Sequence, residues 1–334
     1  MPPRDFALLP TPGQIEDLTR RRLLVVMPTL VVLAASISCG DSDPQPTPAT
    51  TTRTFTDDSG SQVEIPTRPE RVIALSQLNV GVIMLELGAK PLGMIKNGGE
   101  WYSALTSVFD FTGIEAIGEF REPDLERIIA LRPDLIIDAC FVSNGTLVAD
   151  HQPLHAQLRA IAPLVLFNAF GHPKDVYPKL GDLLGKEVQA RVTELQQDYE
   201  ERLTDLRSKF PGDIGDVTVG MFHFRGEEFL LPPLALTELI VLQDLGVRLS
   251  APNVAATPLS LEQLNVIDAD LLLFLNTTAA RVQNLPTWQS HPAVKAGQFL
   301  ELPPRPGNGY TRAFQTIDAL EKLLLAPHFR SDLA

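Results

Sequence analysis

The chain of 334 residues has few cysteines, few histidines and little positive charge. It holds 28 Lys and Arg residues against 41 Asp and Glu residues, which gives a formal net charge of −13. This charge repels nucleic-acid backbones and no basic stripe offsets it, so we expect no nucleic-acid partner. The two cysteines lie far apart in the sequence. Cys39 follows the amino-terminal apolar run, whereas Cys140 lies well inside the remaining chain, which argues against an internal disulfide.

The motifs of common enzyme classes are also missing. The chain has no Gly-x-Ser-x-Gly, no His-Glu-x-x-His, and no Gly-rich phosphate loop ahead of Lys-Ser/Thr. Six histidines offer little material for acid–base chemistry at neutral pH. Cys140 has no histidine beside it in the sequence, so it is interpreted as a structural buried thiol. The sequence therefore predicts no catalytic residue, and an exported enzyme stays the main competing class.

A direct metal carrier is the second competitor. His151 and His155 are four residues apart, but Pro153 lies between them and the sequence suggests no third ligand nearby. We therefore expect no metal ligands and no resident cofactor.

The amino-terminal region carries the marks of an export signal. An apolar run over residues 23–38 follows three arginines and is shorter than the roughly 20 residues that a membrane span needs. This pattern predicts a signal peptide over residues 1–38. Residues 19–24 read Thr-Arg-Arg-Arg-Leu-Leu and resemble a twin-arginine signal, so export by either the general or the twin-arginine route stays open.

Residues 36–40 (SISCG) resemble a bacterial lipobox, in which Cys39 becomes the lipidated first residue of the mature protein. Residues 39–54 are rich in Pro, Thr and Asp and cannot bury a core, which predicts a flexible tether. We expect an exported protein held on the cell membrane by lipid on Cys39, facing the extracytoplasmic side. The alternative is cleavage near Ala35, with Cys39 left as a free thiol.

The body contains an internal repeat. Residues 123–137 (PDLERIIALRPDLII) align without a gap on residues 259–273 (LSLEQLNVIDADLLL), so that Glu126 matches Glu262 and Asp134 matches Asp270. Each copy has the apolar spacing of a short amphipathic helix, followed by an apolar run that suits a buried parallel strand. Ser260 and Gln263 can form a capping box on the second helix. Two α/β lobes are therefore expected.

A long helix is predicted between the two copies. Val188, Val192, Leu195, Tyr199, Leu203 and Leu206 recur at steps of three and four residues, and the other faces of the predicted helix are charged. At 1.5 Å per residue, a helix of roughly 25 to 30 residues reaches about 40 Å, enough to span two lobes. A solvent-facing helix on a single domain is the alternative.

These features together resemble the ABC-transporter substrate-binding proteins that carry ferric siderophores, ferric citrate, haem or cobalamin. The resemblance lies in residues 55–66 (FTDDSGSQVEIP), in Arg71 and the four residues after it, and in the PDLERIIALRPDLII segment. It implies an α/β fold of two Rossmann-like lobes joined by a single long backbone helix. The expected boundaries are an amino-terminal lobe over residues 55–176, the connecting helix over 177–211, and a carboxyl-terminal lobe over 212–334.

The resemblance also implies a ligand held in a shallow cleft between the lobes, lined by loops at strand ends. Several of these loops carry aromatic and cationic side chains, which together suit a bulky anionic ferric chelate. The cleft loops are expected at residues 76–79, 96–102, 119–122, 138–143, 222–225, 276–281 and 302–310. The candidate ligand-binding residues are Trp101, Tyr102, Arg121, Phe222, Arg225, Arg305 and Tyr310.

For Glu126 and Glu262 the resemblance implies docking. In the family a glutamate on each lobe meets arginines of the permease, and these two occupy equivalent places in the repeat. The alternative is that both are ordinary helix-face acids that gain from the helix dipole.

The sequence thus predicts a monomeric lipoprotein that captures a ferric siderophore. It delivers this ligand to an ABC permease dimer with its ATPase. A haem or cobalamin carrier of the same fold is the alternative.

Overall fold

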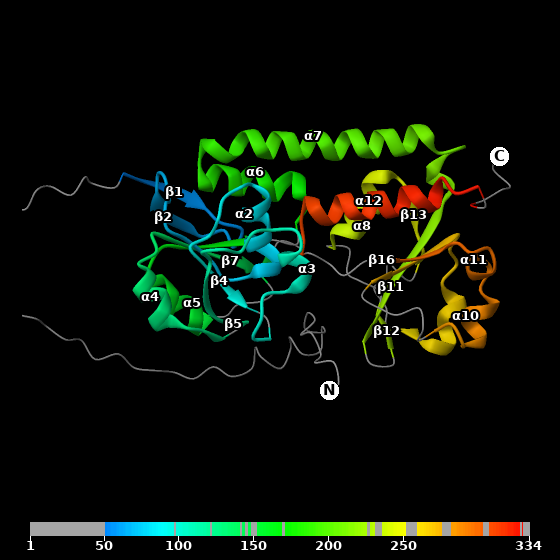
Figure 1. The fold of residues 1–334 in the computed structure, drawn as a ribbon, viewed down its shortest axis with the longest axis horizontal. Coiled ribbons are helices and arrows are strands. Elements are labelled where there is room, and N and C mark those ends of the chain that lie inside the picture. Colours follow the sequence, from blue (N-terminus) through cyan, green and yellow to red (C-terminus); the bar gives the residue numbers. More distant parts are fainter. Residues whose placement is uncertain are drawn as a thin grey trace, which may run out of the picture. The chain divides into compact units, whose positions relative to one another are not determined.

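The computed structural model in Figure 1 describes residues 51–329 apart from short gaps. Predictions for the leader and for Cys39 concern residues outside this description. The gaps are residues 97, 121, 141, 144–145, 148–151, 169–170, 226–227, 231–235, 252–258, 276–281, 303–306 and 328.

The amino-terminal lobe is built on a sheet whose strands lie in the order β10-β7-β3-β4-β5-β6, all parallel except the short β6. Its strands read as continuous apolar runs because both faces are covered: Ile136 and Ile137 are fully buried in different core clusters. Its elements are β3 (Val72–Ala74), η1 (Gln77–Gly81), α2 (Val82–Glu86), β4 (Gly93–Lys96), α3 (Ser103–Thr106), β5 (Glu115–Glu119), β6 (Glu122–Pro123), α4 (Leu125–Leu131), β7 (Leu135–Cys140), β8 (Val142–Ser143), β9 (Thr146–Leu147), α5 (Gln152–Arg159), β10 (Leu164–Asn168) and α6 (Pro173–Leu184).

A hairpin of β1 (Thr52–Thr56) and β2 (Gln62–Pro66) precedes this sheet. The predicted tether over residues 39–54 is wrong at its carboxyl end, because residues 52–54 are already paired with β2. The hairpin turn closes the free edge of β10. The Leu166 N–H donates to the Asp57 carboxylate at 3.2 Å, and the Asp58 N–H donates to the Leu166 carbonyl at 3.0 Å. Residues 55–60 (FTDDSG) therefore have a structural role: they cover the edge strand of the sheet.

The carboxyl-terminal lobe has a second sheet, with the order β14-β12-β11-β15-β16 and β13 beside β11. Strands β11, β15 and β16 run parallel, whereas β12 runs antiparallel to both of its neighbours, β11 and β14. Its elements are η2 (Ile214–Asp216), β11 (Thr218–Arg225), β12 (Glu228–Leu230), α8 (Thr237–Leu245), β13 (Arg248–Leu249), β14 (Leu259–Ser260), η3 (Leu261–Val266), β15 (Leu271–Leu275), α10 (Pro286–Ser290), α11 (Pro292–Lys295), β16 (Phe299–Leu302) and α12 (Tyr310–Leu324).

The repeat found in the sequence is also a repeat in structure. Asp134 precedes β7 and accepts the Arg71 N–H at 2.9 Å, while its own N–H donates to the Arg71 carbonyl. Asp270 precedes β15 and exchanges the same two hydrogen bonds with Thr218. The second helix differs in type: η3 is a 3₁₀-helix of six residues, whereas α4 is an α-helix of seven. Its predicted Ser260–Gln263 capping box is present.

The long helix is α7 (Lys186–Lys209), which packs on α6 of the first lobe and on α12 and α8 of the second (Figure 1). The predicted span of 177–211 is wrong at its start, because residues up to Leu184 form the separate helix α6. Gly185 separates the two helices with φ of +108°, a conformation that only glycine adopts readily.

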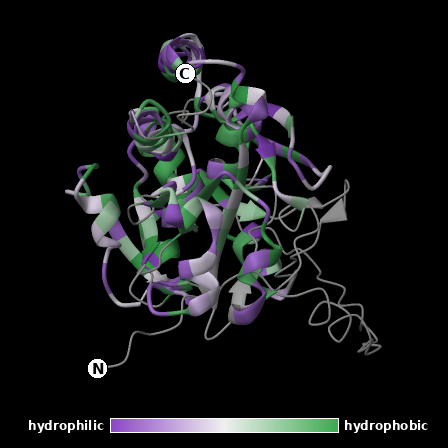
Figure 2. Cartoon of the chain, turned by 90° about the vertical axis from the view of Figure 1, so that its right-hand side faces the viewer, coloured by the Kyte–Doolittle hydropathy of each residue, from purple (hydrophilic) through white to green (hydrophobic). Residues whose placement is uncertain are grey.

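The predicted apolar stripe of α7 faces the core. Val192, Leu195, Tyr199 and Leu203 are buried, and Val188 is half-buried. Figure 2 shows α7, the uppermost helix, as mostly hydrophilic, with hydrophobic residues gathered on elements below it. One core cluster contains residues of α7 and of both lobes, so the helix is packed into the molecule along its length.

Candidate functional site

The carboxyl ends of β3, β4 and β5 bring several of the predicted cleft loops together. Lys96 ends β4, and its ammonium lies 5.2 Å from the centre of the Trp101 ring, a cation–π contact. The Trp101 ring also packs on Phe111 at 5.1 Å. Glu119 ends β5 and accepts the Gly99 N–H at 3.1 Å, which holds the loop over the strand ends.

Gln77 fixes the next part of this loop. It is buried at the start of η1, and its Oε1 accepts the Tyr102 N–H at 3.1 Å. Its Nε2 has no hydrogen-bond partner among the residues that the structure describes. The predicted residues Trp101 and Tyr102 are half-buried, so each keeps part of its surface accessible. Lys96, Trp101 and Tyr102, which we call the strand-end cluster, form the described part of the predicted ligand surface.

Loops from the two lobes also meet at η1. The Asn308 side chain donates to the Asn79 Oδ1 at 2.7 Å, and the Asn308 N–H donates to the Leu78 carbonyl at 2.8 Å. Gly307 lies against the same carbonyl, where an added Cβ would come within 2.7 Å. The predicted cleft loops 76–79 and 302–310 are therefore in contact.

A buried carboxylate makes a second contact between the lobes. Glu86, at the end of α2, accepts the N–H groups of Tyr310 at 3.0 Å and Thr311 at 2.9 Å, in the first turn of α12. The Tyr177 hydroxyl donates to the same carboxylate. Burial raises the pKa of Glu86, although these hydrogen bonds act in the opposite direction. The sequence analysis missed Glu86, whose one signal is an acid within the apolar segment VIMLE.

Phe222 does not fit its predicted role. It lies within β11, fully buried, with its ring 4.3 Å from Phe274, which in turn packs on Trp288. Both faces of β11 are covered, so alternation along the strand turns this ring into the lobe core instead of toward a ligand.

Tyr310 is also a core residue. Its fully buried ring packs on Tyr177 at 4.5 Å, on Tyr199 at 5.5 Å and on Phe314 at 5.9 Å. As the first residue of α12 it lies under α7, which leaves no ring surface for a ligand. The sequence analysis placed Tyr310 in a loop, but it is the first residue of α12, and this is why its ring is buried.

Three predicted arginines cannot be placed. Arg121 and Arg305 lie outside the described residues, and only the backbone of Arg225 is described, at the end of β11. Phe120, next to Arg121, is 44% exposed.

Glu126 and Glu262 occupy matching positions. Each is exposed and stands two residues after a helix N-cap, Asp124 for α4 and Ser260 for η3. The pKa of Glu262 lies below its ordinary value, first because its own backbone N–H donates to the carboxylate and then because the Ser260 hydroxyl does.

The remaining chemistry of the amino-terminal lobe is structural. Cys140 is buried, and burial together with Asp58, Asp57 and Asp138 raises its pKa to about 12, so the thiol is protonated at neutral pH. His155 is buried and lies 3.2 Å from the Asp138 carboxylate. Within the described residues, no group of three His, Cys, Asp or Glu side chains is arranged to hold a metal.

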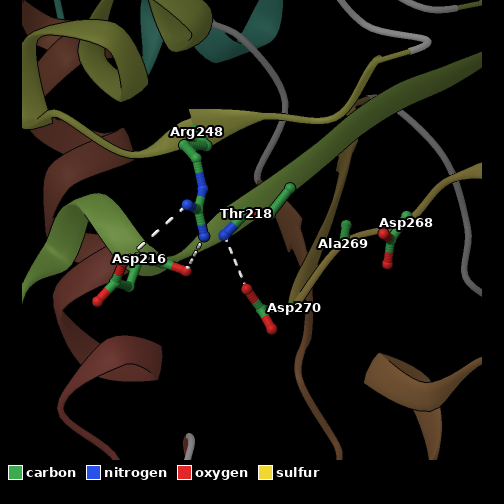
Figure 3. Close-up of a pocket in the computed structure, with 6 residues that line it drawn as sticks. All are labelled: Asp216, Thr218, Arg248, Asp268, Ala269 and Asp270. Carbon is green, nitrogen blue, oxygen red and sulfur yellow. Dashed lines mark hydrogen bonds and ion pairs between the residues drawn. The ribbon is translucent and has the colours of Figure 1, made fainter.

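A surface pocket lies in the carboxyl-terminal lobe, at the amino-terminal ends of β11 and β15 (Figure 3). Asp216, Asp268, Asp270 and Arg248 line it, and the Asp270 carboxylate accepts the Thr218 N–H. Three carboxylates beside one guanidinium do not suit an anionic ligand.

Comparison with protein families decides what this architecture is. Residues 96–306, more than half of the chain, match the family model described as periplasmic binding protein. The chain belongs to the periplasmic binding protein family. This family consists of binding proteins, which agrees with the lack of enzyme motifs.

Curated relatives of this periplasmic binding protein carry names from iron uptake. The probable siderophore-binding lipoprotein YfiY of Bacillus subtilis is 29% identical over 84% of this chain and 89% of its own. The Fe(3+)-citrate-binding protein YfmC of the same organism is 26% identical over 83% and 87%. The achromobactin-binding periplasmic protein of Dickeya dadantii is 28% identical over 69% and 77%.

Solved structures share the two-lobed fold. Staphylococcus aureus SirA complexed with staphyloferrin B superposes on this periplasmic binding protein with a TM-score of 0.67 at 22% identity, covering 82% of this chain and 98% of that one. PiuA of Streptococcus pneumoniae gives a TM-score of 0.65 at 19% identity, covering 83% of this chain and 100% of that one.

In the part of the chain that the structure describes, none of the helices has both the length and the apolar composition that a membrane span requires.

Proposed function

We propose that this protein binds a ferric siderophore between its lobes and delivers it to the permease of an ABC importer. The observation that carries the proposal is the strand-end cluster, in which the Lys96 ammonium lies over the Trp101 ring beside the half-buried Tyr102. A ferric chelate with catecholate or carboxylate arms is a bulky anion with flat apolar edges, so a cation next to aromatic faces suits it.

Two further features support this site. It lies at the carboxyl ends of parallel strands, where ligands of open α/β sheets bind. The buried Gln77 amide, which has no partner for its Nε2 among the described residues, offers a donor that an oxygen-rich ligand can satisfy. The names of the relatives YfiY, YfmC and the achromobactin-binding protein point to the same class of ligand.

A fluorescence titration of residues 51–334 tests the ligand. The probes are ferric complexes of a catecholate, a hydroxamate and citrate, together with haemin, cobalamin and ferric ion alone. Trp101 is the expected reporter, because the second tryptophan, Trp288, is buried in the core of the other lobe. Saturable quenching by one ferric chelate that is lost in Trp101→Phe supports the proposal. Binding of haemin or cobalamin alone replaces the ligand, and silence across all probes overturns it.

A charge variant tests the role of the cluster. Lys96→Gln should weaken chelate binding about fivefold to tenfold, the effect of removing one cation near an aromatic ligand site. Lys295→Gln is the matched control, because Lys295 is exposed on α11 in the other lobe and the charge change is the same. Equal weakening in both variants would indicate a general charge effect and not a site.

Docking of the permease through Glu126 and Glu262 is the second part of the proposal. One exposed carboxylate at the same position in each lobe suits a partner that presents the same basic group twice, such as a permease dimer. Glu126→Ala with Glu262→Ala should lower cellular uptake of a radiolabelled ferric chelate about tenfold or more without changing its affinity for the purified protein. Glu201→Ala, an exposed acid on α7, is the control. Unchanged uptake in the double variant would contradict docking through these residues.

The remaining parts of the proposal concern location and assembly. We propose that the protein is a monomer without catalytic activity, anchored to the extracytoplasmic side of the cell membrane by lipid on Cys39. Cys39→Ser should move it from the membrane fraction to the soluble extracytoplasmic fraction and abolish incorporation of a labelled fatty acid. Retention of label in this variant would show that the anchor lies elsewhere.

A further inference from the structure

The Gln77 side chain is buried and leaves one of its polar atoms unused. It is 1% exposed, and among the residues that the structure describes its Nε2 meets no acceptor. Its Oε1 accepts the Tyr102 N–H at 3.1 Å. A backbone N–H can only donate, so the amide oxygen must face Tyr102 and the amide nitrogen must face away from it. Gln77 therefore presents buried N–H groups that need an acceptor.

The backbone around Gln77 holds this amide in one place. Gln77 begins η1, a π-helix, in which the Gly81 N–H donates to the Ser76 carbonyl, five residues back, at 2.8 Å. Turns of this kind are rare and occur frequently at functional sites. The Asn79 side chain donates to the Ser76 hydroxyl at 3.0 Å and braces the same turn. Because the turn is braced, the amide is preorganised for a ligand.

This amide lies beside the strand-end cluster. Strands β3 and β4 are neighbours in the sheet, Gln77 follows the end of β3, and Lys96 ends β4. Tyr102, whose N–H holds the amide, belongs to the cluster and is half-buried. The Lys96 ammonium and the Gln77 Nε2 are both groups that only donate hydrogen bonds. A ligand on the cluster thus meets donors that follow two adjacent strands.

Iron changes what the arms of a siderophore offer to such donors. In a metal-free hydroxamic acid or catechol, the hydroxyl groups keep their protons at neutral pH, and each proton needs an acceptor of its own when it is buried. Binding of ferric ion releases these protons to solvent, because a metal ligand must be deprotonated. The iron-bound oxygens are then anionic and only accept hydrogen bonds, and charge-assisted bonds to them are roughly twice as strong as neutral ones.

We propose that Gln77 is a specificity contact that distinguishes the ferric chelate from the metal-free siderophore. Its Nε2 donates to an iron-bound oxygen of an arm that enters beside Tyr102. This inference rests on the proposed function, and it names the form of ligand that the site takes: a hydroxamate or catecholate chelate whose oxygens have lost their protons to iron binding. A metal-free arm offers a weaker acceptor to Nε2 and brings buried hydroxyl protons as well.

Calorimetric titration of the full-length protein at pH 7 measures this preference. The probes are desferrioxamine B, a trihydroxamate, and enterobactin, a tricatecholate, each as the ferric complex and without metal. The wild type should bind the ferric form about tenfold or more tightly than the metal-free form. Gln77→Met removes the N–H groups without adding charge and should lower this ratio of dissociation constants about tenfold, mainly through the ferric form.

The ratio separates ligand contact from a structural role. Loss of the acceptor for the Tyr102 N–H weakens both forms alike and leaves the ratio unchanged. Gln197→Met, at an exposed position of α7, is the matched control and should keep the ratio within twofold of wild type. A Gln77→Met ratio within twofold of wild type, or a wild type that binds both forms equally, overturns the inference.

Nuclear magnetic resonance of the wild-type fold tests the same contact directly. In protein labelled with [¹⁵N]glutamine, the side-chain amide signals that are missing from Gln77→Met belong to Gln77. Gallium replaces ferric ion in the probes, because its complexes have the same charge and are diamagnetic. The signals should move downfield on saturation with the gallium complex and not with the metal-free siderophore. Signals that stay in place with the gallium complex overturn the inference.

The titrations also distinguish the failure of each idea. If the wild type binds ferric citrate and neither ferric probe, the inference is wrong and the proposed function stands. If the wild type binds no ferric chelate at all, both are wrong. If a ferric probe binds and the ratio does not depend on Gln77, the inference alone fails.

Discussion

The Glu86 carboxylate lies buried in one lobe and receives hydrogen bonds from the first turn of a helix in the other. Backbone N–H groups at a helix start have no partner within the helix, so this carboxylate satisfies donors that would otherwise be buried without one. A carboxylate in this position carries a cost, because burial disfavours its charged form and raises its pKa.

Glu86→Gln should therefore change how stability depends on pH. Because the pKa of Glu86 is raised in the folded state, its contribution to stability is greatest below its ordinary pKa, roughly pH 4, and declines as pH rises through the raised pKa. The neutral amide has no such dependence. Urea unfolding of both proteins between about pH 4 and pH 8 should show the wild type losing stability relative to the variant as pH rises. A difference that is constant with pH, or that grows in favour of the wild type, would contradict this account.

Glu86→Ala is the comparison that isolates the hydrogen bonds. It removes the acceptor for Tyr310, Thr311 and the Tyr177 hydroxyl, and it should cost about 2–4 kcal/mol of unfolding free energy near pH 4, measured by urea unfolding. The cost should shrink as pH rises, because the wild type loses stability and the alanine variant does not.

Cys140 should be unreactive in the folded protein. Burial and the neighbouring carboxylates raise its pKa to about 12, so the reactive thiolate is scarce and inaccessible. Treatment of residues 51–334 with iodoacetamide at pH 8 should give no mass increase over minutes, whereas the urea-unfolded chain should gain one adduct. Rapid modification of the native protein would show that this thiol is open to solvent.

At the scale of elements, Gly185 sets where the long helix begins. Its φ of +108° breaks the path from α6 into α7, and no atom lies within 4 Å of an added Cβ, so the demand for glycine is conformational and not steric. Gly185→Ala should lower the unfolding free energy by about 1–3 kcal/mol, the cost of a strained backbone. Urea unfolding measures it, with the exposed α7 variant Gln197→Ala as a control expected within about 0.5 kcal/mol of wild type. A stability equal to that of the control would mean that the helix junction adjusts freely.

The same junction shows where sequence analysis works. The apolar stripe of α7 and both repeat units were predicted because helix and strand periodicities are local signals. The break at Gly185 was missed because apolar periodicity continues through Leu183 and Leu184 into α7, and a glycine alone does not reveal its φ.

The site was less predictable than the fold for a physical reason. Placement at strand ends follows from sequence, and it brought Trp101 together with Lys96 and Tyr102 together with Gln77. The direction of a side chain cannot be predicted from sequence in the same way. Phe222 and Tyr310 belong to the predicted cleft loops 222–225 and 302–310, yet both side chains are buried in the core. Contacts between distant segments, such as Asn79 with Asn308, depend on how the lobes pack and leave no local pattern.

At the scale of the whole molecule, the contacts between the lobes argue for small movement on binding. The helix α7 is packed on α6 in one lobe and on α12 in the other, and α12 also receives the Glu86 carboxylate. The Asn79–Asn308 pair adds a further contact between loops. Closing the lobes by a large hinge rotation would break these hydrogen bonds and the packing of α7, which together oppose it.

Binding of a ferric chelate should therefore leave the distance between the lobes almost unchanged. Spin labels at Ser107→Cys and Gln289→Cys, both exposed and in different lobes, report this distance by pulsed electron paramagnetic resonance, and the buried Cys140 should stay unlabelled. The mean distance should shift by less than about 2 Å on saturation with the chelate identified by titration, as in preorganised binding proteins. Glu86→Ala in the same background should broaden the distance distribution, since it removes one of the contacts that hold α12. A shift well beyond this limit in the wild-type background would show that the joint opens, and would make lobe closure, and not a fixed cleft, the signal that a permease recognises.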